Sequence, residues 1–279
     1  MSLAGFASES RPASIAHFDP RRAGEPVVFV HGFGHCHAVW DVAVAALPDR
    51  FRPIAIDLPG HGQSPWSPEP DYGLDRMAAA LEAVVRSQGG TGVHLVGHSL
   101  GGQVAMMAAE RLGPHARSLT LVDIGPTVAT DGAGAVLGEV ADTFRVYESV
   151  DEYVRILARM HPFAKADSLV RLAEAGLARR LDGRFEPALD PAFVTAAATP
   201  SSEATSARLW ATYQGLRLPI FVARGALSSI LSAETCEEMM RRAGGSAQTR
   251  VFERAGHSVM LDSADAFGDA LVAFLEEAG

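Results

Sequence analysis

Ser99 lies in a short pattern of residues that is suited to holding a nucleophile. An apolar run at residues 93–96 ends in Gly97-His98-Ser99-Leu100-Gly101, and a helix-like segment, 103–112, follows at once. This order is typical of a strand that turns sharply into a helix, where glycines two residues before and after the serine leave room for the turn. The N–H groups and the dipole at a helix start favour negative charge. The pattern therefore predicts a serine hydroxyl held beside an anion-stabilising site.

A serine hydroxyl needs a base to remove its proton, and histidine has a suitable pKa near neutral pH. We predict that His257, directly after the last predicted strand, is this base. The other histidines are weaker candidates. His98 precedes the serine, so its side chain is expected to point away from it, whereas His61 is expected to organise a turn and His31 to anchor a glycine-rich loop.

Apolar runs and helix-like segments alternate along the chain, which predicts an α/β fold with a mainly parallel, twisted sheet and helices on both faces. Between about residues 126 and 211 the strand pattern stops, and helical stretches predict an inserted helical cap. The domain organisation we expect is a core of residues 1–125 and 212–279 with a cap of 126–211. The predicted strands are 27–30, 53–56, 93–96, 118–122, 219–223 and 249–252, with an edge strand near 14–18; the predicted cap helices are 136–147, 150–160 and 168–179.

Four sequence features follow the ends of predicted strands. These are the glycine-rich loop after Phe29, then Ser99, Asp123 and His257. Binding sites in parallel sheets form at the carboxyl ends of the strands. We therefore expect these four features to meet at one edge of the sheet.

Composition narrows the possible partners. The chain has 279 residues, 48% of them hydrophobic, and a formal net charge of −9. This charge argues against nucleic acid or an anionic membrane as partner. The start of the chain lacks the apolar centre of a secretory signal, and the two cysteines, Cys36 and Cys236, show no framework spacing. We expect a cytoplasmic enzyme that acts on a small molecule, as a monomer or a small homo-oligomer.

Four motifs in order resemble those of the α/β-hydrolase superfamily, in its capped, serine-nucleophile form. They are His31-Gly32-Phe33-Gly34, Asp57-Leu58-Pro59-Gly60-His61-Gly62-Gln63-Ser64, Gly97-His98-Ser99-Leu100-Gly101-Gly102 and Ala255-Gly256-His257. The resemblance runs from about Pro26 to the C-terminus. It implies an oxyanion hole made by the backbone N–H groups of Phe33 and Leu100, and it implies no metal and no organic cofactor.

The chain departs from this family at the triad acid. Relatives usually read Arg-Gly-x-x-Ser-Asp after the strand that follows the cap, but here Ser229 stands at the aspartate position. A serine cannot stabilise an imidazolium by charge. A subset of the family, including an amidohydrolase that acts on an acetamidomethylene-succinate, carries the acid after the strand that follows the nucleophile, which is the place of Asp123. Of the other candidates, Asp57 is structural by the resemblance, and Asp262 is expected to cap a helix.

Substrate contacts are harder to assign. His37 and Trp40 follow the glycine-rich loop closely and are predicted to line the pocket, as is His161 of the cap. The cap also offers arginines that either grip a substrate carboxylate or lie on solvated helix faces, and these are Arg145, Arg155 and Arg159. The His35-Cys36-His37 cluster has no further ligand at a convincing spacing, so we predict no metal site.

The function predicted from these residues is a serine hydrolase. Ser99 attacks the carbonyl of a carboxylic ester, thioester or activated amide, His257 transfers the proton, Asp123 orients His257, and water releases the acyl-enzyme. Three alternatives stay open: a carbon–carbon bond hydrolase of meta-cleavage type, a cofactor-independent dioxygenase, and a non-catalytic ligand sensor. Leu100 argues against the dioxygenase, whose members tend to have histidine after the serine.

Overall fold

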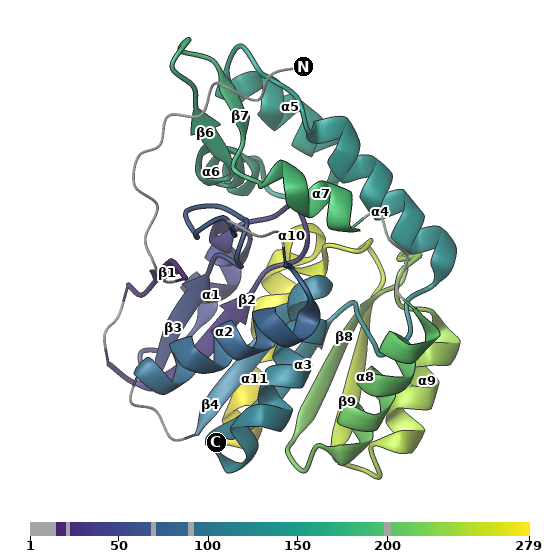
Figure 1. The fold of residues 1–279 in the computed structure, drawn as a ribbon. Helices are drawn as coiled ribbons and strands as arrows, with labels where there is room; N and C mark the ends of the chain where they lie inside the picture. Colours follow the sequence, from purple (N-terminus) through teal and green to yellow (C-terminus); the bar gives the residue numbers. More distant parts are fainter. Residues whose placement is uncertain (1–14, 21–22, 68–70, 89–91, 198–201) are drawn as a thin grey trace.

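The computed structural model describes residues 15–20, 23–67, 71–88, 92–197 and 202–279, and it contains a seven-stranded sheet (Figure 1). The strand order is β1-β3-β2-β4-β5-β8-β9. Only β1 runs antiparallel to its neighbour, so the predicted mainly parallel sheet is confirmed. The strands are β1 His17–Phe18, β2 Glu25–Val30, β3 Phe51–Ile56, β4 Val93–His98, β5 Ala116–Val122, β8 Ile220–Gly225 and β9 Ala247–Phe252.

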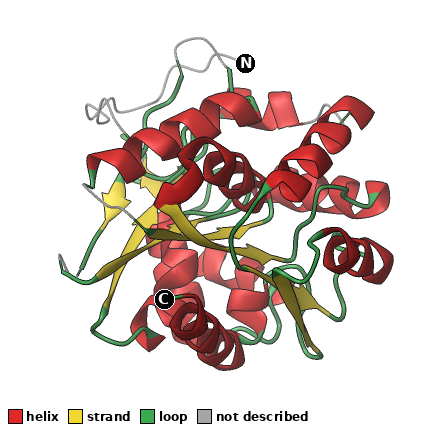
Figure 2. Cartoon of the chain, turned by 90° about the horizontal axis from the view of Figure 1, so that it is seen from below, coloured by secondary structure: helices red, strands yellow, loops and turns green. Residues whose placement is uncertain are grey.

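Both faces of the sheet are covered by helices (Figure 2), as predicted. The residues of β2 show why, because Val28 and Val30 pack into one apolar core while Val27 and Phe29 pack into the other. A strand buried on both faces is expected to be apolar at every position. The first face carries α2 Leu74–Ser87, α3 Leu100–Leu112, α8 Glu203–Gly215 and α9 Ala233–Arg242, and the second carries α1 Asp41–Ala46 and α11 Ala264–Ala278.

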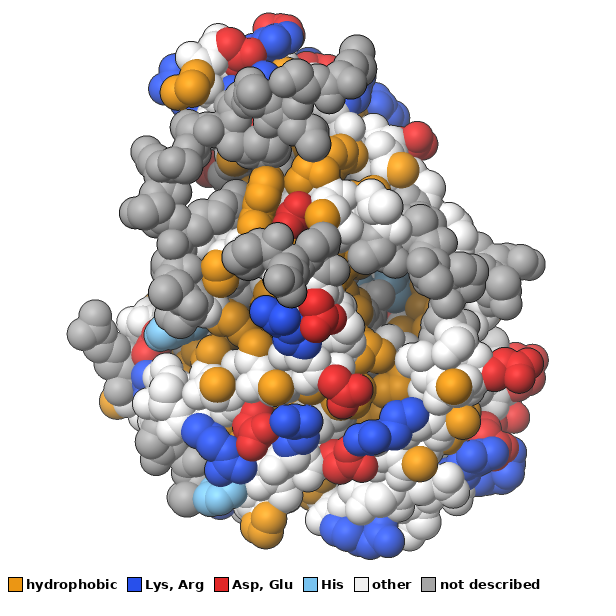
Figure 3. Space-filling view, in the orientation of Figure 1, with side chains coloured by type: hydrophobic (Ala, Val, Ile, Leu, Met, Phe, Trp, Pro, Cys, Tyr) orange, Lys and Arg blue, Asp and Glu red, His pale blue; other side chains and the backbone are white. Residues whose placement is uncertain are grey.

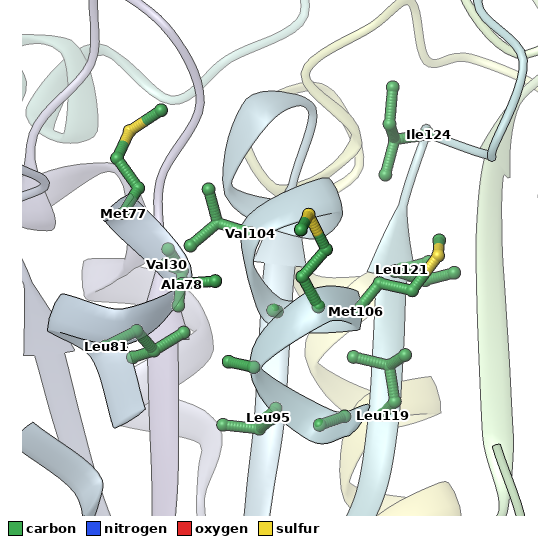
Figure 4. Close-up of a cluster of buried hydrophobic side chains, with 14 of the residues drawn as sticks. Val30, Met77, Ala78, Leu81, Leu95, Val104, Met106, Leu119, Leu121 and Ile124 are labelled. Carbon is green, nitrogen blue, oxygen red and sulfur yellow. The ribbon is translucent and has the colours of Figure 1, made fainter. Parts of the chain in front are cut away.

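The core beneath the serine turn is well packed (Figure 4). Met77 and Leu81 of α2 and Val104 of α3 lie over Leu95 and Leu119 of the sheet, and all five are almost completely buried. Burying a side chain of this size contributes about 1.5–3 kcal/mol. The carboxyl ends of β4 and β5 are therefore held on a rigid base.

A cap, defined here as the elements from α4 to α7, covers the carboxyl ends of the strands (Figure 1). The helix predicted at 150–160 is confirmed as α5, and Ser149 caps it by accepting a hydrogen bond from the amide of Glu152. Within the range expected for the cap, α8 packs on α3 of the sheet-bearing core. The cap elements are α4 Thr130–Thr143, α5 Val150–Met160, α6 Ala166–Gly176, β6 Leu177–Arg179, β7 Phe185–Pro187 and α7 Pro191–Ala197.

The prediction that no strand occurs in the cap region is wrong. The helix expected at 168–179 ends at Gly176, and β6 pairs antiparallel with β7. The turn between them contains Asp182, which accepts a hydrogen bond from the amide of Arg184, and Gly183, whose φ is +85°. An Asp-Gly pair is a hairpin signal, but strands of three residues are too short to show a periodic pattern.

The end of the cap is tied to the loop that follows β3. The amide of Gly62 donates to the carbonyl of Ala188 at 2.7 Å, and the amide of Asp190 donates to the carbonyl of Gly60 at 2.8 Å. The hydroxyl of Tyr72 also donates to the carboxylate of Asp190. Cap and core are thus hydrogen-bonded directly beside the glycine-rich loop. None of the described helices is long and apolar enough to cross a lipid bilayer.

Candidate active site

Ser99 occupies a strained turn between β4 and α3. Its φ and ψ are +52° and −125°, a region that side-chain-bearing residues rarely adopt. The two glycines around it are needed for space. A Cβ at Gly97 would lie 2.4 Å from the carbonyl oxygen of Gly101, and a Cβ at Gly101 would lie 2.3 Å from that of Val30. The predicted strand–turn–helix around the serine is present.

Asp123 shares this unusual backbone conformation. In the described part of the chain, Ser99 and Asp123 are the only residues other than glycine with positive φ. Such a conformation costs about 1–3 kcal/mol and occurs most often at functional sites. Asp123 directly follows β5, and its amide donates to the carbonyl of Ala223 at 2.7 Å. This hydrogen bond fixes the backbone at the point where the carboxylate of Asp123 turns away from β5.

The carboxylate of Asp123 is fully buried and contacts His257. Its Oδ2 lies 2.8 Å from Nδ1 of His257, and its Oδ1 accepts a hydrogen bond from the amide of Gly225 at 2.9 Å. An ionised carboxylate only accepts hydrogen bonds, so Nδ1 of the imidazole carries the proton. Nε2 is then the basic nitrogen; it is buried and has no hydrogen-bond partner in the described chain.

Ser228, which the sequence analysis did not single out, completes this arrangement. Its hydroxyl donates to Oδ2 of Asp123 and accepts a hydrogen bond from the amide of Ile230 at 3.0 Å. Ser229, at the position where relatives have their acid, lines the neighbouring cavity. A serine is an ordinary loop residue, so only its contact with the buried carboxylate distinguishes Ser228.

The two other candidate acids have different partners. Asp57 accepts hydrogen bonds from the amide and Nδ1 of His37. Asp262 is the last residue of α10 Val259–Asp262, not the N-cap that we expected, and its Oδ2 accepts a hydrogen bond from the amide of Gly256 at 2.9 Å. Asp262 therefore supports the loop that carries His257 without contacting the ring nitrogen that Asp123 holds.

The glycine-rich loop after β2 lies directly against Ser99. A Cβ at Gly32 would lie 2.6 Å from Nδ1 of His98 and 3.0 Å from Cβ of Ser99. Only glycine allows so close an approach. The peptide that joins Gly32 to Phe33 is thereby brought next to Ser99, and Leu100 begins α3 on the other side of the serine.

Two buried histidines hold this loop in place. Nε2 of His31 accepts a hydrogen bond from the amide of Leu58 at 2.9 Å, so its Nδ1 donates to the carbonyl of Gly32 at 2.8 Å. Nε2 of His61 accepts from the amide of Gly34 at 3.2 Å. Burial, followed by the charge of His31, lowers the pKa of His61 to about 3, so its ring stays neutral. His31 anchors the glycine-rich loop as expected, and His61, which was expected to organise its own turn, contacts the Pro59 carbonyl of that turn and also holds the glycine-rich loop.

A cavity of about 240 Å³ lies between the cap and the carboxyl ends of the strands. It contains Ser99, His257 and the predicted substrate-binding residue His161, and Phe33 forms part of its wall. Figure 3 shows a hollow between cap and core on the face that it presents. The other lining residues are Gly34, His35, His98, Val136, Glu139, Val140, Thr143, Tyr153, Leu157, Met160, Leu227, Ser228, Ser229, Ile230, Gly256, Ser258 and Asp262.

The structure does not place His37 or Trp40 in this cavity. The ring of His37 stacks on Phe18, with centroids 3.3 Å apart, and its Nδ1 faces Asp57. Trp40 is fully buried against Phe29 in the second core. The short 3₁₀ helix His37–Trp40 turns both side chains away from the serine.

Instead, His35 and His98 line the cavity. The expectation that His98 points away from the nucleophile is wrong, because the strand alternation ends at the left-handed Ser99. Nε2 of His98 donates to the backbone carbonyl of His257 at 3.0 Å, and the two rings lie 4.5 Å apart. Burial, followed by the charge of His257, lowers the pKa of both His98 and His161, the latter to about 4. Neutral imidazoles therefore lie beside His257.

One group of side chains outside the cavity has atoms that could ligate a metal. Ligand atoms of Cys36, His37 and Asp57 lie within 4.8 Å of one another. Burial, followed by the charge of Asp57, raises the pKa of the Cys36 thiol far above its usual value. Nδ1 of His37 already pairs with Asp57 at 3.0 Å. His37 and Asp57 are thus paired with each other, and the Cys36 thiol beside them is held in its protonated form.

Comparison with known proteins agrees with this geometry. The sequence pattern of a family described as the alpha/beta hydrolase family matches residues 27–270. The chain is 28% identical to 2-(acetamidomethylene)succinate hydrolase from Mesorhizobium japonicum, over 78% of this chain and 77% of that protein. It is also 28% identical to an esterase from Mycobacterium tuberculosis, over 85% and 78% of the two chains.

A solved structure gives the same result. The crystal structure of E-2-(acetamidomethylene)succinate hydrolase superimposes with a TM-score of 0.80 at 25% identity, over 94% of this chain and 99% of that one. The family match covers most of the sequence, and its relatives include ester and amide hydrolases. The chain therefore belongs to the α/β-hydrolase family and is a hydrolase of esters or amides.

Proposed function

We propose that Ser99, His257 and Asp123 form a catalytic triad that hydrolyses a carboxylic ester, thioester or activated amide of a small molecule. Nε2 of His257 takes the proton of Ser99 as its Oγ attacks the acyl carbonyl, and Asp123 stabilises the resulting imidazolium. His257 then returns the proton to the leaving group, which departs as an alcohol, thiol or amine. Water, activated by the same histidine, releases the acid product from the acyl-enzyme.

The backbone N–H groups of Phe33 and Leu100 are proposed to bind the oxyanion during both steps. The approach of Gly32 to the Cβ of Ser99 and the position of Leu100 at the start of α3 support this assignment. Donors set in place where charge develops lower the barrier because they need no reorganisation. His31 and His61 act indirectly, since each holds the loop that carries the Phe33 amide.

The observation that carries the proposal is the Asp123–His257 pair, 2.8 Å apart, with the other imidazole nitrogen unpartnered in the described chain. His257 and Ser99 both line the same cavity. A non-catalytic sensor would have no use for a fully buried carboxylate in a strained backbone conformation. The volume of about 240 Å³ favours a small acyl group.

We extend the proposal to a cytoplasmic location and to a small-molecule acyl substrate as the partner of this site. The support for the location is that Cys36 and Cys236 are buried free thiols. Free thiols persist in a reducing compartment.

Burst kinetics with 4-nitrophenyl acetate and butyrate test the triad. We expect a burst of nitrophenol equal to the enzyme concentration, and mass spectrometry should place the acyl group on the peptide that contains Ser99. Ser99→Ala should abolish the burst and reduce turnover by about 10⁴-fold or more. Turnover by Ser99→Ala equal to that of the native protein would contradict the proposal.

A further inference from the structure

The cavity beside Ser99 has an unusual set of charges for a family with an acidic substrate among its members. None of its described lining residues is lysine or arginine. Two carboxylates, Glu139 on α4 and Asp262 on α10, line it instead. The histidines beside the triad do not supply the missing charge, because burial lowers the pKa of His35, His98 and His161.

The arginines of the cap are directed elsewhere. Arg145 pairs with Glu152 at 3.1 Å and its guanidinium lies over the ring of Tyr147. Arg155 and Arg159 of α5 are exposed, and neither lines the cavity. Of the two interpretations that the sequence allowed for these arginines, the structure therefore supports solvated helix faces.

Asp262 adds a second acidic side chain to the cavity wall, close to His257. Its Oδ2 accepts the amide of Gly256, next to His257, whereas its Oδ1 is buried without a hydrogen-bond partner in the described chain. Burial raises the pKa of this carboxyl group, so the exposed Glu139 is the stronger source of negative charge in the cavity wall. An acyl group with its own carboxylate would meet two acidic side chains and no lysine or arginine among the described lining residues, and it would also lose its hydration.

We infer that the cavity selects acyl groups without negative charge and rejects acyl groups that end in a carboxylate. This inference rests on the proposed function of the same site. By this reasoning, the succinate derivative for which one relative is named is a poor substrate for this chain. The cavity instead suits short, uncharged acyl groups, whose carbonyl reaches Ser99 while the remainder contacts Val140, Leu157 and Met160.

Two esters that differ only in charge test this inference. 4-Nitrophenyl glutaramate and 4-nitrophenyl glutarate have acyl chains of equal length, which end in an amide and a carboxylate respectively. We expect kcat/KM to favour the glutaramate ester by about 30-fold at low salt, with a smaller preference at 0.5 M salt because ions screen the repulsion. Equal rates within threefold, or a preference for the glutarate ester, would overturn the inference.

A charge reversal at Glu139 locates the effect. Glu139 is exposed, so its replacement should leave the fold intact. We expect Glu139→Lys to raise kcat/KM for the glutarate ester about tenfold relative to kcat/KM for the glutaramate ester. Glu276→Lys makes the same change in net charge at an exposed position of α11, away from the cavity, and should alter neither rate. Equal effects of both variants would mean that net charge, not the cavity, controls selection.

The same experiment separates the two proposals. If the native protein cleaves both esters equally and Ser99→Ala cleaves neither, only the charge inference fails. If native protein and Ser99→Ala are equally inactive, the proposed function fails, and calorimetric binding of glutaramate and glutarate still decides charge selection. Tighter binding of glutarate would overturn the inference in that case.

Discussion

The described part of the chain contains two aspartate–histidine pairs with a buried carboxylate, and only one of them is suited to catalysis. Asp123 with His257 and Asp57 with His37 both join a fully buried carboxylate to Nδ1 of an imidazole, at 2.8 Å and 3.0 Å. Each aspartate directly follows a strand of the sheet, β5 or β3. The histidines are similarly exposed, at 18% and 15% of their side chains. A search for such pairs alone would not distinguish the two sites.

The difference lies in what surrounds each pair. The ring of His37 stacks on Phe18. Asp57 also accepts hydrogen bonds from the amides of His37 and Gln63, so this pair holds the adjoining loop backbone in place. The ring of His257 lines the cavity, with its Nε2 unpartnered in the described chain. An aspartate–histidine pair becomes a candidate for catalysis when the second ring nitrogen can reach a substrate.

Replacing the acid in the first pair should have the largest effect. We expect Asp123→Asn to lower kcat for 4-nitrophenyl butyrate about 10³–10⁴-fold, because the amide cannot stabilise the imidazolium or enforce the required tautomer. The melting temperature should change little in comparison. A loss of less than tenfold in steady-state assays would remove Asp123 from the triad.

The matching change in the second pair should affect stability instead. Burial would raise the pKa of Asp57, but hydrogen bonds and charge from His37 and His31 lower it overall, so the group is ionised in the fold. Breaking a buried pair by removing one partner costs about 3–5 kcal/mol. We expect Asp57→Asn to lower the free energy of unfolding by about 3 kcal/mol in urea, while the folded fraction keeps kcat within threefold. If Asp57→Asn lowered kcat as much as Asp123→Asn, the two pairs would not differ in function.

Acid should lower the free energy of unfolding, because buried histidines around both pairs stay neutral in the fold. His61 and His161 have pKa values of about 3 and about 4 in the fold, whereas an unfolded histidine titrates at 6.5. Below pH 6.5 the unfolded chain binds protons that the folded chain excludes, so stability is present above this pH and declines as pH falls towards 4.

At pH 5, each of these histidines should cost about 2 kcal/mol of stability. Urea midpoints at pH 7 and pH 5 measure the loss. His61→Gln, which keeps an acceptor for Gly34, should reduce the difference, and His17→Gln on the exposed β1 should not. Identical pH dependence in the native protein and both variants would show that the His61 ring does not stay neutral in the fold.

The smallest predicted effects on kcat are those of substitutions at the adjacent residues Ser228 and Ser229, and the two positions should respond differently. Ser228→Ala removes a hydrogen bond to a charged carboxylate, so we expect kcat to fall about tenfold, with partial rescue in Ser228→Thr. Ser229→Ala should change kcat less than twofold, and Ser229→Asp should not increase it because Asp123 already holds Nδ1 of His257. Increased activity in Ser229→Asp would instead indicate that the usual acid position is the functional one.

The sequence predicted those parts of the site that local rules determine. The glycines around Ser99 and the loop of His257 mark a strand–turn–helix and a strand end, and the missing carboxylate at Ser229 directed attention to Asp123. The sheet and most of its helices followed from apolar periodicity. The remaining features depend on how distant segments approach one another.

Side-chain direction was the main source of error. His35 and His37 are two residues apart, and only the 3₁₀ turn at His37 decides which of them faces the cavity. His98 was misplaced because strand alternation does not extend through a left-handed residue. Ser228 and the β6–β7 hairpin have short or common sequence signals, so their positions become evident only from contacts across the fold.

The hydrogen bonds between residues 188–190 and the loop after β3 limit how this enzyme can be recombined with its relatives. Ala188 and Asp190 bond Gly62 and Gly60, which flank His61, the residue that holds the amide of Gly34. A chimaera that imports a foreign cap together with these residues would disturb the backbone beside the glycine-rich loop. The junction for cap grafting therefore belongs before Ala188, so that the graft ends at β7 and the native anchor is retained.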